Sequence, residues 1–372
     1  MNVEGSNVLI EANAAMNGGD GPQSYSQNSF FQKTGLEAVK EILQKEIRDK
    51  FDVVKPSPSE SLTVKIADFG CSTGPNTFHA VQIILEAIQH NLQSETLDSQ
   101  GPEFQVFFND LVTNDFNTLF ASLPPKRQYY AAAVPGSFYD VVLPKSSLHF
   151  AYSAFSLNWL SKLPLEIMDE NSPAWNEGMI LYSSKRKDVL RAYAVQFADD
   201  FESFLCARKQ ELVSGGLVSV LVSGVPIGTS FSETSTGKLY EIFGSCFVDI
   251  ANKGLIHKDK VDSFNLPAYY PSPTEIKAVV EKNGDFSIEK MEILPNPAFR
   301  TKVPDLKKRA TSFRAVYEGI LSKHFGSEFV DKLFKLFCKK LDNETELALF
   351  LNSEKKNLAL LFVLLKLKPS PH

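Results

Sequence analysis

Two acidic side chains and a glycine loop in the first third of the chain are the residues best suited to chemistry. The apolar run 62–69 contains Asp68 and leads into the loop Gly70-Cys71-Ser72-Thr73-Gly74, after which a helical pattern begins. A glycine loop between a strand and a helix typically binds a nucleotide or nucleoside at the carboxyl edge of a sheet. The loop lacks the third glycine of the G-x-G-x-x-G pattern, so an NAD-dependent dehydrogenase is not favoured. The competing interpretation is an ordinary strand-to-helix turn.

The charge of Asp68 narrows the class of ligand. A carboxylate beside the loop repels a pyrophosphate but attracts the ammonium and sulfonium charges of S-adenosylmethionine. Asp110 ends the next apolar run and is the candidate partner for ribose hydroxyls. It lies about 40 residues from the loop instead of the roughly 20 that are usual, and the polar stretch 93–103 accounts for the difference. We therefore expect a cofactor site at the ends of two neighbouring strands.

The patterns around these residues predict the sheet that must hold them. Short apolar runs alternate with stretches of helical periodicity, which indicates a parallel sheet with helices on both faces. The expected strands are 62–69, 104–108, 130–134, 148–153 and 216–223, with 286–294 and 357–366 as a further pair at the sheet edge. The expected helices are 29–51, 77–92, 115–122 and 188–212. Helical stretches between Ser235 and Leu347 exceed what the sheet needs, so they predict an inserted helical cap.

Six motifs in the same order resemble those of the plant SABATH methyltransferases. They are Ser24–Ser29, Asp68–Asn76, Phe108–Asp110, Val134–Tyr139, Ser156–Trp159 and Phe264–Tyr269. The resemblance runs from about Met16 to the C-terminus and implies an α/β fold, with a Rossmann-like class I methyltransferase sheet and a helical cap. Members of the family methylate small acids such as salicylate, benzoate, jasmonate, loganate or indole acetate. One branch methylates xanthine alkaloids on nitrogen.

The resemblance and the patterns together divide the chain into three parts. Residues 1–24 are expected to be a flexible N-terminal segment that closes over the site. Residues 25–230 and 285–372 are expected to form the α/β domain that binds S-adenosylmethionine. Residues 231–284 and parts of 303–345 are expected to form the helical cap around the acceptor pocket.

The resemblance assigns a set of residues to the cofactor. These are Tyr25, Asp68, Asn76, Asp110, Leu111, Ser137 and Phe138. The set has acids for the amine and the ribose, and apolar residues to flank the adenine.

The resemblance also places Gln32 and Trp159 on the acceptor carboxylate, and the chemistry explains why these residue types suit the task. A carboxylic acid with a pKa near 4 is already ionised at cell pH, so it needs no general base. Attack on the sulfonium methyl neutralises both charges in the transition state, so a buried arginine would favour the ground state and raise the barrier. A neutral amide and an indole N–H orient the oxygens with less of that penalty. Catalysis is then mainly proximity and alignment.

Further residues are expected to shape the acceptor pocket, and some depart from better-known relatives. The set comprises Tyr25, Phe155, Asn158, Tyr240, Tyr269 and Phe313. Phe155 stands where salicylate-type enzymes tend to carry tyrosine, and Asn158 replaces the methionine or histidine often found before the tryptophan. An amide at position 158 indicates a hydroxylated or otherwise polar acceptor. The acid itself is left open.

Some relatives carry a magnesium site away from the chemistry. The matching positions are Asn176, Asp262, the carbonyl of Phe264, and Asn265. Oxygen ligands of this kind suit a hard cation. One carboxylate makes a poor cage, so ordinary hydrogen bonding within a loop is an equal alternative.

Composition excludes several classes of function. The net charge of −5 over 372 residues disfavours a nucleic-acid binder, because such proteins need a basic surface. The longest apolar run, 358–365, is too short to cross a bilayer, and the polar first 21 residues lack the features of a secretory signal. We expect a cytoplasmic protein that acts on a small molecule, and the resemblance implies a homodimer.

Three functions remain open from the sequence. The leading one is an S-adenosylmethionine-dependent carboxyl O-methyltransferase that forms the methyl ester of a small plant acid. The nearest alternative is a xanthine alkaloid N-methyltransferase. A protein of another class, which binds cofactor and ligand without turnover, is the third.

Overall fold

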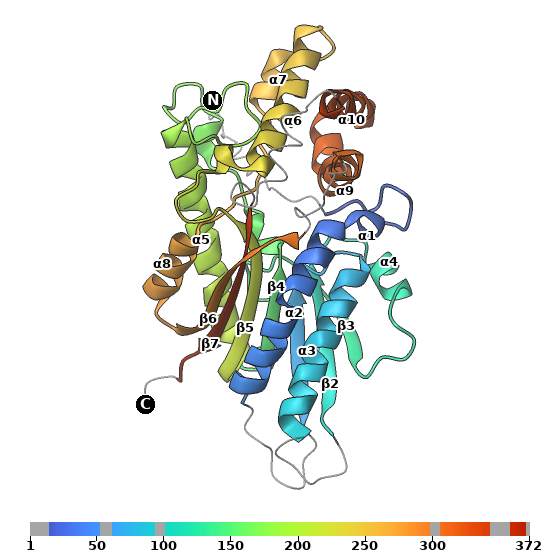
Figure 1. Ribbon diagram of the computed structural model, residues 1–372, viewed down its shortest axis with the longest axis vertical. Coiled ribbons are helices and arrows are strands. Elements are labelled where there is room, and N and C mark those ends of the chain that lie inside the picture. Colours follow the sequence, from blue (N-terminus) through green and yellow to red (C-terminus); the bar gives the residue numbers. More distant parts are fainter. Residues whose placement is uncertain (1–14, 53–61, 94–100, 298–305, 343–357, 370–372) are drawn as a thin grey trace, which may run out of the picture.

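A seven-stranded sheet forms the centre of the molecule, with the strand order β3-β2-β1-β4-β5-β7-β6 (Figure 1). The computed structural model describes residues 15–52, 62–93, 101–297, 306–342 and 358–369. The parallel strands are β1 Thr63–Phe69, β2 Glu103–Asp110, β3 Tyr130–Pro135, β4 Leu148–Ala154 and β5 Leu212–Gly224. The antiparallel pair is β6 Phe286–Pro295 and β7 Ala359–Leu367. The predicted parallel sheet and C-terminal strand pair are confirmed, and β7 lies inside β6 between it and β5.

The order of the strands creates the site. The first strand of the sheet in the sequence, β1, pairs with β2 on one side and with β4 on the other, so the strand order reverses at β1. Ligands of such sheets bind in the crevice outside the carboxyl ends of the strands at this reversal. Asp68 lies near the carboxyl end of β1, opposite Phe108 of β2 and Tyr152 of β4. Asp110 is the last residue of β2.

Helices cover both faces of the sheet. Helices α2 Phe30–Lys50 and α3 Pro75–Gln93 pack together on one face, and α5 Lys187–Glu211 and α8 Pro273–Asn283 pack on the other (Figure 1). Helix α2 buries Leu36, Val39, Leu43 and Ile47, whose spacing places them on one side of a helix. Alternate residues of the strands serve the two apolar clusters, as the pleat of a strand requires.

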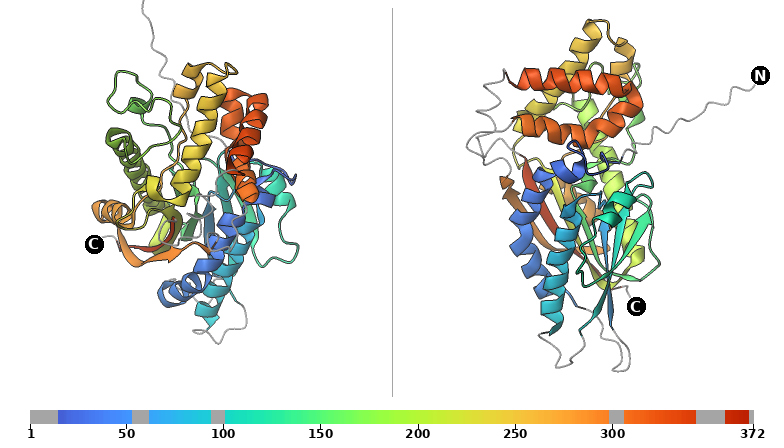
Figure 2. Two further views of the ribbon diagram at one scale, coloured as in Figure 1. Left: turned by 45° about the horizontal axis from the view of Figure 1, so that its top comes forward. Right: turned by 90° about the vertical axis from the view of Figure 1, so that its right-hand side faces the viewer.

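The helical cap lies over the carboxyl ends of the strands. It contains α6 Ser235–Asn252, α7 Lys258–Asp262, α9 Leu306–Phe325 and α10 Ser327–Leu341, and Figure 2 shows α9 and α10 side by side. Its interior is rich in aromatic rings, among them Phe243, Phe313 and Phe337. Helix α8 falls within the range 231–284 expected for the cap, but it packs against α5 and β6 and so covers the sheet. Among the described helices, none combines the length and apolar character needed to cross a membrane.

The segment before α2 is hydrogen-bonded to the cap helix α9 and to Asp115. Asn17 donates its backbone N–H to the carbonyl of Ala315 on α9 at 3.0 Å, and Tyr25 donates to the carbonyl of Asn17 at 2.8 Å. Gly19 donates to Oδ2 of Asp115, the N-cap residue of α4 Phe116–Ala121, at 2.9 Å. Of the segment 1–24, residues 1–14 lie outside the described residues, whereas residues 15–24 are held by hydrogen bonds. The short helix α1 Tyr25–Asn28 follows and contacts α9.

Candidate active site

The loop after β1 bends back over the end of β2. The backbone N–H groups of Gly70 and Cys71 both donate to the carbonyl of Asn109, at 2.8 and 3.0 Å. Ser72 adopts a left-handed backbone conformation with φ of 52° and donates its N–H to Oδ2 of Asp110 at 2.7 Å. The loop predicted to bind the cofactor therefore lies against the second predicted acid.

Asp68 and Asp110 are two carboxyl groups in a poorly solvated environment. Burial raises the pKa of Asp68 to about 7 and that of Asp110 to about 6, although hydrogen bonds lower both values in part. Thr77 donates its hydroxyl to Asp68, and Leu111 donates its N–H to Asp110 at 2.8 Å. In the described part of the chain, neither acid forms an ion pair with a lysine, arginine or histidine. A cationic ligand would favour the ionised form of both groups.

Tyr25 approaches the same two acids from the N-terminal segment. Burial raises the pKa of its phenol above its usual range, and the charges of Asp110 and Asp68 raise it further. The structure thus brings together residues from the N-terminal segment, β1 and β2. This grouping was predicted from the motifs.

A cavity of about 300 Å³ opens beside this group. Among the predicted cofactor residues, those that line it are Tyr25, Asp110, Leu111, Ser137 and Phe138. Asp68 lies outside the lining, bonded to Thr77, and would act on a ligand through its charge. Asn76 also lies outside the lining, because its amide donates to the carbonyl and the hydroxyl of Ser29 at 3.1 and 2.9 Å. Asn76 therefore ties the start of α3 to the start of α2.

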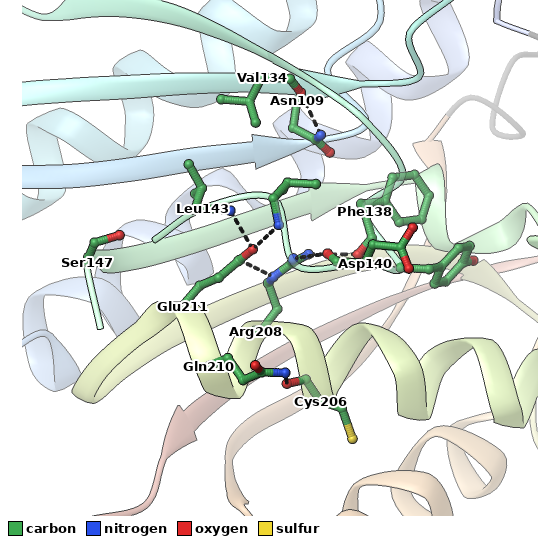
Figure 3. Close-up of polar contacts among 12 residues, drawn as sticks. Asn109, Val134, Phe138, Asp140, Leu143, Ser147, Cys206, Arg208, Gln210 and Glu211 are labelled. Atoms are coloured by element: carbon green, nitrogen blue, oxygen red, sulfur yellow. Dashed lines mark hydrogen bonds and ion pairs between the residues drawn. The ribbon is translucent and has the colours of Figure 1, made fainter. Parts of the chain in front are cut away.

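One wall of this cavity is held from behind by a buried ion pair. Arg208 donates from Nε to Glu211 at 2.8 Å, and neither side chain has exposed surface (Figure 3). The guanidinium also donates to the carbonyls of Phe138 and Asp140, at 2.8 and 3.0 Å. The other oxygen of Glu211 accepts the N–H groups of Val142 and Leu143, at 2.6 and 2.9 Å. The pair fixes the backbone of the loop that carries Phe138, and the sequence patterns did not reveal it.

A second cavity of about 310 Å³ lies between the cap and the ends of the strands. Its predicted lining residues are Gln32, Phe155, Asn158, Trp159, Tyr240 and Phe313. Helix α9 contributes residues along one side, from Lys308 and Arg309 to Tyr317. Burial lowers the pKa of Arg309 to about 10. Aromatic rings make up much of the remaining wall.

The two cavities share part of their walls. The shared residues are Gln32, Phe155, Trp159 and Val316. The amide of Gln32 and the indole N–H of Trp159 have no hydrogen-bond partner within the described residues. Both predicted acceptor-binding donors therefore lie at the junction between the cavities and are available to a ligand.

Backbone contacts on both sides hold Trp159 at this junction. The preceding Phe155 has a left-handed backbone with φ of 61°, and a turn of 3-10 helix, Ser156–Asn158, follows it. Tyr139 donates its hydroxyl to the carbonyl of Trp159, and Trp159 forms a β-bridge with Ala268. The position of the indole is thus set by several segments of the chain.

Two of the predicted pocket residues play a different part. The amide of Asn158 donates to the carbonyls of Ser223 and Tyr269, both at 2.8 Å, and accepts the N–H of Ser223 at 3.0 Å. An amide engaged in this way joins the turn to β5, so the interpretation that Asn158 recognises a polar acceptor does not fit the structure. Tyr269 points away from the cavity and donates to Glu275 at 2.6 Å, whereas its neighbour Tyr270 lines the wall.

The main pocket residues that the motifs missed are Tyr270 and Tyr317. Tyr317 follows Phe313 by four residues on α9, so a helical projection from the predicted Phe313 would have found it. Tyr270 follows Tyr269 in an extended segment, where neighbouring side chains point to opposite sides. No pattern in the sequence indicates which of the two faces the cavity.

The predicted metal positions come together in the cap but bond mainly to protein groups. Asn176 donates from Nδ2 to Oδ1 of Asn265 at 2.7 Å, and Gly178 donates to Oδ1 of Asp262 at 2.9 Å. The Oδ1 atom of Asn176 is buried without a partner, which fits an oxygen ligand, whereas the unpaired Nδ2 of Asn265 does not. Among the described residues, no cluster of three or more histidine, cysteine or acidic side chains could hold a metal ion.

Comparisons with known proteins agree with this geometry. A family model described as SAM-dependent carboxyl methyltransferase matches residues 11–368. A loganic acid O-methyltransferase of Catharanthus roseus is 46% identical over 343 residues, which cover 90% of this chain and 89% of the relative. A paraxanthine methyltransferase of Arabidopsis thaliana is 41% identical over 326 residues, 86% of this chain and 90% of the relative. The solved structure of a loganic acid methyltransferase with SAH has a TM-score of 0.90 at 44% identity, covering 95% of this chain and 99% of that one.

Proposed function

The chain belongs to the family of S-adenosylmethionine-dependent carboxyl methyltransferases, and from this premise we propose that Gln32 and Trp159 hold the carboxylate of a small acid for methylation. The enzyme forms a methyl ester, which is the reaction given by the description of the matching family model. The reaction then takes place beside Gln32 and Trp159.

The observation that carries the proposal is the junction between the two cavities. The cavity beside Asp110 suits a cationic cofactor, and the aromatic cavity under the cap suits an apolar acceptor. A methyl group must pass from one to the other, and Gln32 and Trp159 border both. Their free N–H groups can each donate to one oxygen of a carboxylate.

The residues present account for the chemistry without a general base. When it is bound, S-adenosylmethionine supplies a methyl group on a positively charged sulfur. Asp68 and Asp110 stabilise positive charge in the first cavity. Gln32 and Trp159 orient the carboxylate by neutral hydrogen bonds, so they lose little when the charge of the acid disappears in the transition state. Alignment of the two reactants supplies the remaining acceleration.

We propose that the acceptor is loganic acid or another acid of similar size. The 46% identity to a loganic acid O-methyltransferase over most of both chains supports this class. The cavity volume of about 310 Å³ is within the range of sites for small organic ligands. The xanthine alternative draws on the paraxanthine relative. A xanthine would accept the methyl group on a ring nitrogen, so it does not present the two equivalent oxygens of a carboxylate to the two donors.

The experiment is an incubation of the purified protein with labelled S-adenosylmethionine and a panel of acceptors, with products identified by mass spectrometry. The panel contains loganic acid, salicylate, benzoate, jasmonate, indole acetate, farnesoic acid and paraxanthine. A methyl ester of an acid supports the proposal and identifies the acceptor. Methylated xanthine alone would contradict it.

We further propose a magnesium ion at Asn176, Asp262, Phe264 and Asn265 as a structural element outside the reaction. The orphan Oδ1 of Asn176 supports it, and the hydrogen bonds of Asp262 and Asn265 argue for loop contacts instead. Elemental analysis of the purified protein, together with melting temperatures with magnesium and with EDTA, decides between the two. No change in melting temperature and no bound metal would rule out the ion.

The family resemblance also leads us to propose a cytoplasmic homodimer. Light scattering of the purified protein tests the dimer, and imaging of a tagged chain in plant cells tests the compartment. A single species at the mass of one chain, 41.4 kDa, would contradict the dimer.

A further inference from the structure

Three tyrosine hydroxyls meet in the wall of the acceptor cavity. Tyr240 comes from α6, Tyr270 from the segment before α8, and Tyr317 from α9. The hydroxyl of Tyr240 lies 2.8 Å from that of Tyr270 and also bonds to that of Tyr317. We call these three side chains the hydroxyl cluster. All three residues line the cavity.

The hydroxyl cluster stands out because its surroundings are apolar or already engaged. The rings of Phe313 and Phe243 pack against it, at 5.1 Å from Tyr240 and 6.5 Å from Tyr317. Gln32 and Trp159 are assigned to the carboxylate, and several other polar groups of this cavity bond within the protein. The amide of Asn158 bonds to the backbone, and Ser312 donates its hydroxyl to the carbonyl of Asn28 at 3.0 Å. A polar spot in an aromatic wall is the usual means by which a pocket fixes the orientation of an apolar ligand.

The hydrogen-bond capacity of the hydroxyl cluster is not exhausted by its internal bonds. Each tyrosine hydroxyl has one proton to donate and lone pairs to accept. Whichever hydroxyls act as donors, the bonds within the cluster leave each oxygen with a lone pair or a proton for a further partner. Burial raises the pKa of Tyr240, Tyr270 and Tyr317, so the cluster stays neutral at physiological pH. A neutral group that both donates and accepts, which is a hydroxyl, matches this arrangement best.

We propose that the hydroxyl cluster of Tyr240, Tyr270 and Tyr317 binds a hydroxyl group of the acceptor, so that the enzyme selects a hydroxylated acid over the same acid without the hydroxyl. This inference rests on the proposed function, because it takes the carboxylate to lie at Gln32 and Trp159.

The location of the cluster limits where the hydroxyl stands on the acceptor. The ring of Tyr317 lies 5.6 Å from that of Trp159. The hydroxyl cluster therefore adjoins the proposed carboxylate site, so we expect the hydroxyl and the carboxylate to stand near each other on the acceptor. An acid whose hydroxyl ends a long chain does not fit this spacing.

The test compares matched acids with and without a ring hydroxyl. The pairs are loganic acid with 7-deoxyloganic acid, and 3-hydroxybenzoate with benzoate. The variants Tyr240→Phe, Tyr270→Phe and Tyr317→Phe each remove a single oxygen and keep the ring. Tyr193→Phe is the matched control, because Tyr193 is buried and donates to the carbonyl of Leu266 at 3.0 Å but does not line the cavity. For each protein, kcat/KM is measured on every acid and the Kd of S-adenosylhomocysteine by calorimetry.

We expect the wild-type enzyme to prefer the hydroxylated member of at least one pair by roughly tenfold or more, because a buried site built for a hydroxyl rejects an analogue that lacks it. At least two of the three cluster variants lose this preference, because their kcat/KM falls much more on the hydroxylated acid than on the deoxy acid. The Kd of S-adenosylhomocysteine does not change. The variant Tyr193→Phe keeps the preference.

The remaining outcomes overturn the inference in distinguishable ways. If the wild-type enzyme esterifies both members of each pair equally, or prefers the deoxy acids, the cluster does not read a hydroxyl and the proposed function stands. If the cluster variants lose activity on both members equally, the three tyrosines serve only to join the helices of the cap. If no acid is esterified at all, the proposed function fails and the inference fails with it.

Discussion

Gly70 and Ser156 are in contact at the edge of the cofactor cavity. The hydroxyl of Ser156 donates to the carbonyl of Gly70 at 3.1 Å, and a methyl group placed on the Cα of Gly70 would lie 2.0 Å from the same oxygen. Gly70 also has a φ of 86°, a backbone conformation that side chains other than hydrogen rarely allow. The turn that leads out of β1 and the turn that carries Trp159 are therefore packed backbone to side chain, with no space between them.

This contact predicts that Gly70→Ala damages cofactor binding. The added methyl group must displace Ser156 or unwind the left-handed turn, at a cost of about 1–3 kcal/mol. We expect the Kd of S-adenosylhomocysteine to rise at least tenfold by calorimetry. The control is Gly101→Ala, because nothing in the described part of the chain lies within 4 Å of the position of its added methyl group. An unchanged Kd in Gly70→Ala would show that the turn tolerates a side chain.

The raised pKa values of Asp68 and Asp110 predict that cofactor affinity depends on pH. In the free protein these pKa values are about 7 and 6, so both groups carry protons below pH 6 and must lose them to stabilise a cation. We expect S-adenosylmethionine to bind more tightly as the pH rises from 5.5 to 7.5, by up to about tenfold per pH unit for one proton released. Above pH 8 both carboxyl groups are ionised and give no further gain in affinity. Calorimetry in buffers of different ionisation enthalpy measures the released protons directly.

The same shift has a consequence for stability that serves as a control. A carboxyl group whose pKa is higher in the folded than in the unfolded state favours folding at low pH. For Asp68 this contribution is lost as the pH rises from the unfolded pKa of roughly 4 to the folded pKa of about 7. The free protein should therefore lose stability between these two pH values, and the bound cofactor should restore it. The increase in melting temperature on adding S-adenosylhomocysteine is therefore expected to be larger at pH 8 than at pH 6. The variant Asp68→Asn should abolish most of this difference, and a difference that persists would assign it to another group.

Trp159→Ala is predicted to reduce turnover much more than cofactor binding. The indole borders both cavities and offers a free N–H, so its removal costs both a hydrogen bond and alignment. We expect kcat/KM for the acid to fall at least 100-fold, the usual scale for a lost positioning contact. The Kd of S-adenosylhomocysteine should change less than about threefold, because Trp159 is assigned to the acceptor and not to the cofactor. The other tryptophan gives a matched control, because Trp175 lies outside both cavities. Equal losses of turnover and cofactor binding would make Trp159 a structural residue.

The buried pair of Arg208 and Glu211 is predicted to set the affinity for the cofactor through the loop it holds. Breaking it with Arg208→Met leaves a buried carboxylate, which typically costs about 3–5 kcal/mol of stability. The double variant Arg208→Met with Glu211→Leu removes both charges and should regain much of that loss. It still leaves the carbonyls of Phe138 and Asp140 without donors, and the N–H groups of Val142 and Leu143 without an acceptor.

The double variant therefore separates stability from positioning. We expect its melting temperature to lie between those of Arg208→Met and the wild-type protein, because the lost backbone bonds still cost stability. Its KM for S-adenosylmethionine should stay several-fold higher than that of the wild type. The KM for the acid should be unaffected. A double variant with a normal KM for S-adenosylmethionine would show that the pair contributes to folding alone.

Much of the fold could be predicted because its signals are local. The strands of the sheet appear as apolar runs, and the spacing of Leu36, Val39, Leu43 and Ile47 identifies α2 from the sequence. The cofactor acids could be found because each lies at the carboxyl end of the strand that positions it. The place of β7 between β5 and β6 could not be predicted, since pairing between strands 140 residues apart in the chain leaves no local pattern.

The parts of the site that escaped prediction depend on contacts between distant segments. The buried ion pair of Arg208 and Glu211 looks like an ordinary pair of charges near the end of a helix until the loop 138–143 is packed on it. Asn158 is engaged by β5, and only the packed structure shows that its amide is not available. The choice between Tyr269 and Tyr270 depends on the direction in which one extended segment enters the cap.

The position of β7 has a consequence for how the protein is made. This strand consists of residues 359–367 of a 372-residue chain, yet it pairs with β5 on one side and β6 on the other. While the chain is still being synthesised, β5 and β6 have no partner on the sides where β7 belongs, and their backbone groups are open to other strands. The sheet can therefore close only after β7 has been synthesised. Premature termination before β7 would leave the nascent enzyme with a gap inside its sheet and a strong tendency to aggregate.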